Sequence, residues 1–159
     1  MASINLNLEL KNFLGKHIKD ICDCGFSDNN SNHCAHFVSH VMGYTFGFRC
    51  KNMTGKGSGF GVNIRVHEVF SRCGKVGEWN DKLKPTGNCL AFVTGLSHVN
   101  LTNKTMVNIP AKHIGIFCNN MIYHYSNSQH KVVCVTPEKF AKHYSGSDIK
   151  VFYGTFPII

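Results

Sequence analysis

Three residues have the side chains and spacing of a nucleophilic acyl-transfer site: Cys34, His113 and His124. Cys34 follows Asn29-Asn30-Ser31-Asn32, whose small polar side chains favour a helix N-cap, and precedes an apolar pattern at helical spacing that Gly43 ends. We therefore predict that Cys34 lies in the first turn of a helix, where unpaired N–H groups and the helix dipole face its sulfur. A thiol in that position tends to have a lowered pKa and to be nucleophilic at neutral pH. The alternative is a buried core cysteine.

The two histidines belong to a predicted β-hairpin. Two runs rich in β-forming residues, 113–118 and 121–126, flank Asn119-Asn120, a pair that tolerates the positive φ of a tight turn. In such a hairpin His113 and His124 lie on one face as diagonal neighbours, about 7–8 Å apart at the backbone, so their rings can meet. We predict that His113 is the base that activates the thiol and that His124 orients His113. The backbone N–H of the cysteine is expected to contribute to an oxyanion hole.

The elements that position these residues follow an α+β order, with helices first and a mostly antiparallel sheet afterwards. The 159 residues are predicted to form a single domain, residues 1–159. Leu6 to Ile21 is predicted to be one amphipathic helix, and Asn63 is predicted to cap a short helix that buries Val66, Val69, Phe70 and Cys73. Glycines between 47 and 61 predict a surface loop. Further elements are predicted as strands at 90–93, 131–135 and 148–156, a hairpin or loop at 96–110, and a short helix at 137–144.

The charge of the chain limits its partners. It carries 17 Lys and Arg against 9 Asp and Glu, a net charge of +8. Such a chain is attracted to anionic polymers, which include nucleic acid, anionic lipid and bacterial cell wall. The basic residues are scattered rather than clustered, so we expect no nucleic-acid partner. No apolar run approaches the roughly 20 residues of a membrane span.

Eight cysteines occur in a sequence whose first twenty residues lack the pattern of a secretory signal peptide. We therefore expect a chain made in the cytosol, not exported by the usual signal-peptide route, whose cysteines are mostly reduced core residues. Cys22 and Cys24 form C-x-C rather than the C-x-x-C of common zinc sites. His36 and His40 lie at i, i+4 and could bind a metal with a third ligand. Because the Glu of H-E-x-x-H is missing, a solvated polar face is the preferred interpretation, and no metal or cofactor is expected.

Several motifs resemble those of the NlpC-like cysteine peptidases, a branch of the papain-like clan. The segment 32–38, Asn-His-Cys-Ala-His-Phe-Val, looks like the family's D-C-S-G-F-V nucleophile motif. Residues 83–92 resemble its L-x-P-G-D-L-V-F-F segment with one or two extra residues, and 113–117 match H-V-G-I-Y. Tyr123-His124 stands where the family places its third polar residue. His33 and His36 depart from the pattern, since they replace an Asp and a Gly.

The resemblance implies a papain-like (NlpC-type) fold and a Cys34, His113, His124 triad. It also implies hydrolysis of an amide in the peptidoglycan stem peptide, commonly between D-glutamate and the diamino acid. A small basic amidase without a signal peptide is similar to the antibacterial effectors that type VI secretion systems inject into a neighbour's periplasm. A cognate immunity protein would then be a partner. The rival is a phage enzyme or an intracellular recycling enzyme.

Two further classes of function stay open. The same Cys-His chemistry serves deamidases, transglutaminases and acyltransferases that act on proteins. From another class, the chain could be an inactive basic binding module. One fast-reacting thiol would indicate a catalytic site, whereas uniformly slow thiols would indicate a binding module.

Overall fold

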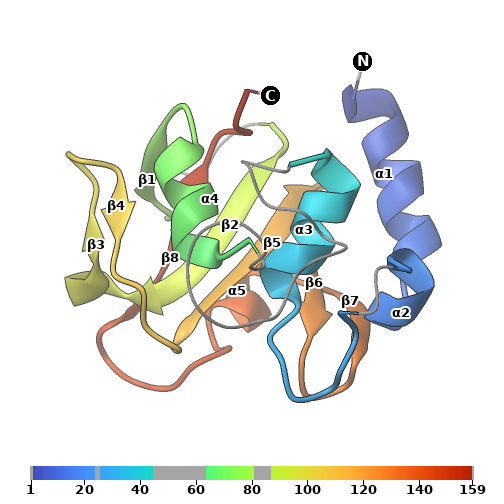
Figure 1. Cartoon of the computed structure of the whole chain (residues 1–159). Helices are drawn as coiled ribbons and strands as arrows, with labels where there is room; N and C mark the ends of the chain where they lie inside the picture. Colours follow the sequence, from blue (N-terminus) through green and yellow to red (C-terminus); the bar gives the residue numbers. More distant parts are fainter. Residues whose placement is uncertain (1, 24–25, 45–63, 81–86, 159) are drawn as a thin grey trace.

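The centre of the fold is a six-stranded antiparallel sheet in the order β1-β8-β2-β5-β6-β7 (Figure 1). The structure is a computed structural model that describes residues 2–23, 26–44, 64–80 and 87–158. The strands of the sheet are β1 (Val76–Glu78), β2 (Cys89–Gly95), β5 (Lys112–Cys118), β6 (Met121–Ser126), β7 (Lys131–Val135) and β8 (Ile149–Gly154). Beside it, β3 (Val99–Asn100) and β4 (Thr105–Met106) form a two-stranded hairpin after the 3-10 helix Leu96–His98.

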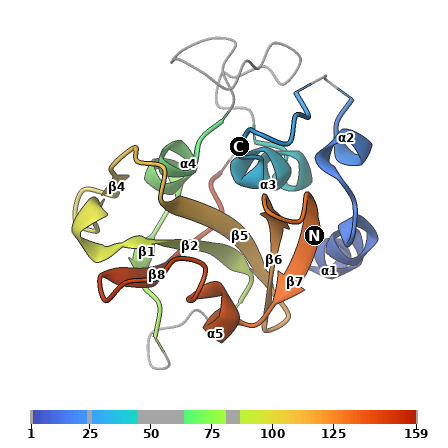
Figure 2. The ribbon, with the colours of Figure 1, turned by 90° about the horizontal axis from the view of Figure 1, so that it is seen from below.

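Helices cover both faces of this sheet. They are α1 (Ala2–Phe13), α2 (Ile18–Ile21), α3 (Cys34–Met42), α4 (Val66–Arg72) and α5 (Pro137–Phe140). Figure 2 shows α3 and α4 on one side of the sheet and α5 on the other. The predicted α+β class, with N-terminal helices on an antiparallel sheet, is therefore confirmed.

Period-two alternation divides the core between the two faces. Ile114 and Ile116 of β5 belong to the large cluster that includes Phe37 of α3. Phe117 belongs to the second cluster, which includes Phe140 of α5. Each residue of β5 therefore points either toward the helix that carries Cys34 or toward α5.

The predicted hairpin and helix start are both confirmed. Asn119 and Asn120 have φ values of 53° and 66°, the positive φ that a two-residue turn needs. Cys34 is the first residue of α3, and Gly43 ends the helix with a left-handed φ of 75°. The predicted strands at 90–93, 131–135 and 148–156 correspond to β2, β7 and β8, and the hairpin within 96–110 to β3 and β4.

The predicted single helix from Leu6 to Ile21 is wrong, because the chain breaks between α1 and α2. Gly15 has a φ of 80° and donates its N–H to the carbonyl of Val132 at 2.9 Å. The N–H of Val132 in turn donates to the carbonyl of Lys16 at 3.0 Å. This exchange with β7 replaces helical hydrogen bonds, and the His17 side chain then caps α2 by accepting from the N–H of Lys19.

Other boundaries differ less. The helix α4 has Arg65 as its N-cap, because the Glu68 carboxylate accepts the Arg65 N–H at 2.9 Å, whereas Asn63 lies outside the described residues. Its predicted inner residues Val66, Val69, Phe70 and Cys73 are all buried. The helix α5 ends at Phe140 rather than Tyr144. The glycine-rich loop predicted for 47–61 lies outside the described residues.

The described cysteines agree with the expectation of reduced core residues. Among the described residues no disulfide joins Cys22, Cys34, Cys73, Cys89, Cys118 or Cys134, and all of these except Cys134 are buried. Within the described ranges, no helix has the length and hydropathy needed to span a membrane.

Candidate active site

The predicted histidine pair is assembled in the sheet. Nε2 of His113 and Nδ1 of His124 are 2.8 Å apart, and the two ring planes lie at 87° to each other. Both side chains are buried, with exposed fractions of 0% and 6%. The hydrogen bond expected from the hairpin register is therefore present.

A third histidine, His143, joins this pair from the loop after α5. Its ring is stacked on the ring of His113, with centroids 4.0 Å apart and planes at 12°. It also makes an edge contact with His124 at 5.8 Å. His143 could not be identified from the sequence, because it falls in the predicted helix 137–144 and no local pattern links it to a strand thirty residues earlier.

Burial controls the charge of these rings. Desolvation, followed by the neighbouring His124 and His143, holds the pKa of His113 well below its usual range. Desolvation and His143 also lower the pKa of His124 to about 4. Both imidazoles are therefore neutral at physiological pH, as a general base must be before it accepts a proton.

Cys34 is held at the start of α3 by asparagine side chains. Its N–H donates to Oδ1 of Asn32 at 2.9 Å. Asn127, which follows β6, donates from Nδ2 to the same oxygen at 2.9 Å and accepts the N–H of His33 at 3.0 Å. These bonds fix the first turn of α3 to the end of β6. They also occupy the Cys34 N–H, so its predicted place in an oxyanion hole is not open in this structure.

The expectation of a lowered thiol pKa is wrong. Cys34 is 1% exposed, and desolvation raises the pKa of its thiol to about 11. The backbone N–H groups of Ile114 and Ala35 and the charge of Lys112 lower this pKa, but by less than burial raises it. The start of the helix therefore lowers the thiol pKa as predicted, but desolvation raises that pKa by more.

The thiol lies against the strand that carries His113. Its sulfur interacts with the N–H of Ile114, the residue that follows His113, and Ile114 shares a core cluster with Cys34. The ring of His113 contacts Phe140 on the α5 side, and its Nδ1 has no hydrogen-bond partner among the described residues. The structure therefore brings the thiol to the backbone beside His113, and no hydrogen bond joins the thiol to the ring.

The pairing between β5 and β6 ends just before the two histidines. The β5–β6 register runs from Cys118↔Met121 to Ile116↔Tyr123, so both histidines lie beyond the end of the paired segment. The two strands diverge next to the N-terminus of α3 (Figure 2). The thiol lies on the α3 face of the sheet, and the imidazole pair lies on the α5 face.

Two more residues border the thiol, and neither was singled out from the sequence. Lys112 is buried, donates from Nζ to the carbonyl of Ile109 at 2.6 Å, and places a positive charge near Cys34. Burial, and to a lesser degree the nearby Cys34, raise the pKa of Tyr144, whose ring packs on that of His143 at 4.7 Å. His143 and Tyr144 therefore place the loop after α5 against the site.

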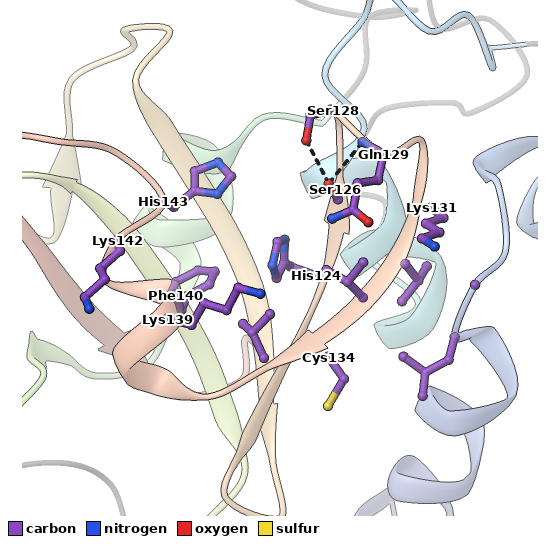
Figure 3. A pocket seen from close by; sticks show the side chains of 15 residues that line it. His124, Ser126, Ser128, Gln129, Lys131, Cys134, Lys139, Phe140, Lys142 and His143 are labelled. Atoms are coloured by element: carbon purple, nitrogen blue, oxygen red, sulfur yellow. Dashed lines mark hydrogen bonds between the residues drawn. The ribbon is translucent and has the colours of Figure 1, made fainter.

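A pocket of about 740 Å³ opens on the α5 side of the sheet (Figure 3). His124 and His143 line it, and so do the side chains of Lys131, Lys139 and Lys142. Cys34 is not among its lining residues. The pocket therefore presents imidazole and ammonium groups, the donors that bind carboxylates.

A comparison of the chain with protein-family models, with curated proteins and with solved structures returned no match in any of the three. Function is therefore inferred from the geometry of the site.

Proposed function

We propose that this protein is a cysteine hydrolase of amide bonds, with Cys34 as nucleophile, His113 as general base and His124 as the residue that positions His113. The observation that carries the proposal is the 2.8 Å bond from His113 Nε2 to His124 Nδ1, which leaves Nδ1 of His113 without a partner. This is the orientation in which one ring nitrogen is held and the other is available for the thiol proton. The next peptide N–H along β5 is the one that contacts the Cys34 sulfur.

The protonation states favour general-base catalysis over a preformed ion pair. The resting thiol is neutral, because its pKa is about 11, and His113 and His124 are neutral as well. As Sγ attacks the amide carbon, Nδ1 of His113 takes the thiol proton, and it then returns that proton to the leaving amine. Water hydrolyses the resulting thioester and regenerates the thiol. Attack requires Sγ and Nδ1, which lie on opposite faces of the sheet, to approach each other past the end of the β5–β6 pairing.

The pocket supports an anionic peptide as substrate. Lys131, Lys139 and Lys142 line it together with His124, and the net charge of the chain is +8. The peptidoglycan stem peptide carries carboxylates that these ammonium groups would bind. We therefore assign the substrate as an amide of the stem peptide, commonly the bond between D-glutamate and the diamino acid.

The finer fold assignment belongs to the same proposal. A helix that begins at the cysteine and packs on an antiparallel sheet carrying the histidines is the arrangement expected of a papain-like, NlpC-type domain. His33 and His36 stand where that family has an Asp and a Gly. Both are buried and neither lines the pocket, so these departures leave the proposed reaction type unchanged.

Digestion of purified peptidoglycan sacculi, analysed by mass spectrometry, tests the activity. We expect new amino termini in the stem peptide, and we expect turnover to fall by several orders of magnitude in Cys34→Ala and His113→Asn. Cys118→Ala, which removes another buried thiol of the same core cluster, is the matched control and should retain activity. Full activity of Cys34→Ala would contradict the proposal.

The biological setting follows from the substrate. We assign the chain to the antibacterial effectors that act in the periplasm of a target cell, with an immunity protein as partner. Expression in a Gram-negative host should cause lysis only when a periplasmic signal is added, and Cys34→Ala should abolish that lysis. Equal harm from the cytoplasmic form would point to an intracellular target.

The burial of Cys34 favours one alternative, a basic binding module without catalysis. Cys34 is 1% exposed, which is also the burial expected of an ordinary core cysteine with no catalytic role. In that case the chain binds sacculi through its positive charge, binding weakens with salt, and no stem-peptide bond is cleaved. The same digestion, with bound protein measured in parallel, separates the two functions.

A further inference from the structure

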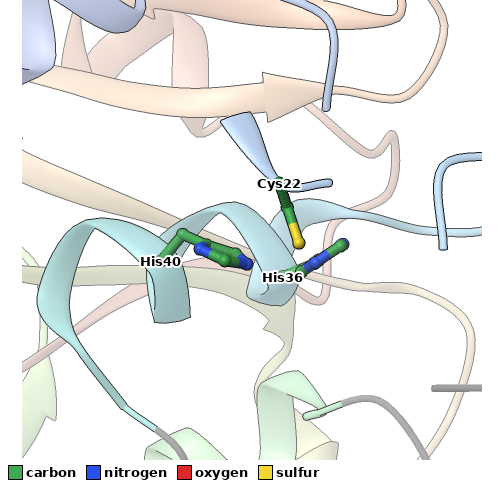
Figure 4. Close-up of side chains that lie close together, drawn as sticks. All are labelled: Cys22, His36 and His40. Carbon is green, nitrogen blue, oxygen red and sulfur yellow. The ribbon is translucent and has the colours of Figure 1, made fainter. Parts of the chain in front are cut away.

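A cysteine and two histidines meet where α2 ends against α3, on the side of the sheet away from the pocket (Figure 4). Cys22 is the C-cap residue of α2, and His36 and His40 are one turn apart on α3. Their potential ligand atoms all lie within 4.8 Å of one another. This geometry overturns the expectation of a solvated polar face for His36, which is 0% exposed, whereas His40 is exposed.

A chain of hydrogen bonds orients His36 toward this cluster. Nε2 of His33 is 2.7 Å from the carbonyl oxygen of Asp28, so Nε2 must carry the hydrogen and donate it. Nδ1 of His33 is then an acceptor, and Nδ1 of His36, 3.2 Å away, must be the donor. The hydrogen of His36 is therefore on Nδ1, which leaves a lone pair on Nε2.

This is the pattern by which proteins prepare histidine ligands. A ligating imidazole donates its second N–H to a neighbouring acceptor, which fixes its tautomer and its orientation. Phe26 packs on the rings of His33 and His36, with centroids 4.8 and 5.3 Å away, and restrains both. The carboxylate of Asp23 acts electrostatically on His40, so a negative charge lies near the cluster.

We propose that Cys22, His36 and His40 form a binding site for a zinc-class divalent transition metal ion. A thiolate with two imidazoles is a ligand set that such borderline ions prefer over Mg²⁺ or Ca²⁺. Tetrahedral zinc with bonds of about 2.3 Å to sulfur and about 2.0–2.1 Å to nitrogen needs ligand atoms about 3.3–3.6 Å apart. A ligand pair at the 4.8 Å limit reaches this separation when its atoms approach by about 1.2–1.5 Å. On binding, the Cys22 thiol releases its proton to solvent.

The site would clamp the nucleophile helix. It joins the end of α2 to the first two turns of α3, the helix whose first residue is Cys34. A bound ion therefore restrains the segment that leads into the candidate active site, with a water molecule in the fourth tetrahedral position. The site is independent of the proposed hydrolase activity, because none of its three ligands is assigned to the reaction.

Metal binding can be measured without an activity assay. Tag-free protein from zinc-supplemented cells should contain one zinc ion per chain by mass spectrometric metal analysis. Exchange with cobalt should give a thiolate-to-cobalt charge-transfer band and the visible bands of a tetrahedral site. Cys22→Ser should abolish the charge-transfer band, and His40→Ala should weaken metal affinity at least tenfold.

The controls carry matched residue types outside the cluster. Cys134→Ser and His130→Asn should keep the metal content and the cobalt spectrum, since Asn tolerates the positive φ of 57° at position 130. Zinc should raise the melting temperature of the original chain but not that of Cys22→Ser. Because each protein is compared with itself, this test still works if a variant has low stability. Absence of metal together with absence of a cobalt band at millimolar cobalt would overturn the proposal. Unchanged metal content in both Cys22→Ser and His40→Ala would overturn it as well.

Discussion

At the scale of single residues, Cys34 is the site where two physical effects oppose each other. The start of α3 and the charge of Lys112 favour the thiolate, whereas complete burial favours the neutral thiol and raises its pKa to about 11. Slow alkylation of the resting chain is therefore expected for a catalytic thiol here as well as for an inert one. The decisive comparison is turnover with and without the thiol.

The first prediction concerns the pH dependence of Cys34 alkylation. Because the thiolate is the reactive form, the iodoacetamide rate should be low at pH 7 and rise about tenfold per pH unit toward pH 11. Peptide mass spectrometry over a pH series measures this rate, with the half-buried Cys134 as an internal reference. A plateau already reached below pH 8 would mean a lowered pKa and a more open site.

The second prediction concerns His124, the residue that we propose positions His113. His124→Ala should fold and lose about 10²-fold in kcat, with KM little changed, because the 2.8 Å bond that orients His113 is lost. His124→Gln can still offer a hydrogen-bond acceptor and should recover part of kcat. A KM effect alone, with kcat unchanged, would instead make His124 a substrate-binding residue of the pocket.

At the scale of elements, the β5–β6 hairpin determines which residues meet. Gly115 is a residue of β5, and a Cβ built there would lie 2.7 Å from Cγ2 of Ile122 and 3.0 Å from the carbonyl oxygen of Tyr123. The close approach of β6 therefore depends on the missing side chain. That approach also brings the His124 ring within reach of His113.

The third prediction follows from this contact. Gly115→Ala should lower the free energy of unfolding by about 1–3 kcal/mol, because the hairpin backbone must shift to admit the methyl group. Urea unfolding measures the change. Gly87→Ala is the control, since nothing lies within 4 Å of its Cβ position. If the two variants had equal free energies of unfolding, the hairpin backbone would accommodate the methyl group without strain, which would contradict the prediction.

Local patterns were sufficient to predict the elements whose signals are themselves local. The Asn119-Asn120 turn, the helix start at Cys34 and the pairing of the two histidines all follow from short-range spacing. The break at Gly15 did not follow, because it depends on an exchange of hydrogen bonds with Val132. Tertiary pairing here overrides an amphipathic pattern.

The candidate site was predictable only in part, for the same reason. Spacing predicted which side chains have suitable chemistry, but burial decides their protonation, and burial is a property of the whole core. His143 stacks on His113, and Cys22 approaches His36, through contacts between elements that are separate in the sequence. No local pattern contains those pairings.

At the scale of the whole molecule, buried neutral histidines make stability depend on pH. The folded pKa values of His113 and His124 are lowered below the unfolded value of about 6.5, the latter to about 4. Protonation therefore favours the unfolded chain. The stabilising contribution is fully present above pH 6.5 and is lost as the pH falls toward the folded values.

The fourth prediction states the size of that effect. The free energy of unfolding should fall by about 2 kcal/mol for each of these two histidines between pH 7.5 and pH 5, since each pH unit below 6.5 contributes about 1.4 kcal/mol per group. Urea unfolding at the two pH values gives the difference. His124→Gln should reduce the dependence, and equal midpoints at both pH values in the original chain would contradict the assignment.

The position of β8 has a consequence for biosynthesis. This strand lies between β1 and β2, and it pairs Gly154 with both Val76 and Leu90. During synthesis, the residues of β1, β2 and the β5–β6 hairpin leave the ribosome before residues 149–154 do. The sheet is nevertheless complete only once β8 has inserted between β1 and β2. Until then one edge of the buried strand β2 has no partner from β8. The sheet is therefore completed only after β8 has emerged, and until then the unpaired edge of β2 is open to edge-to-edge association.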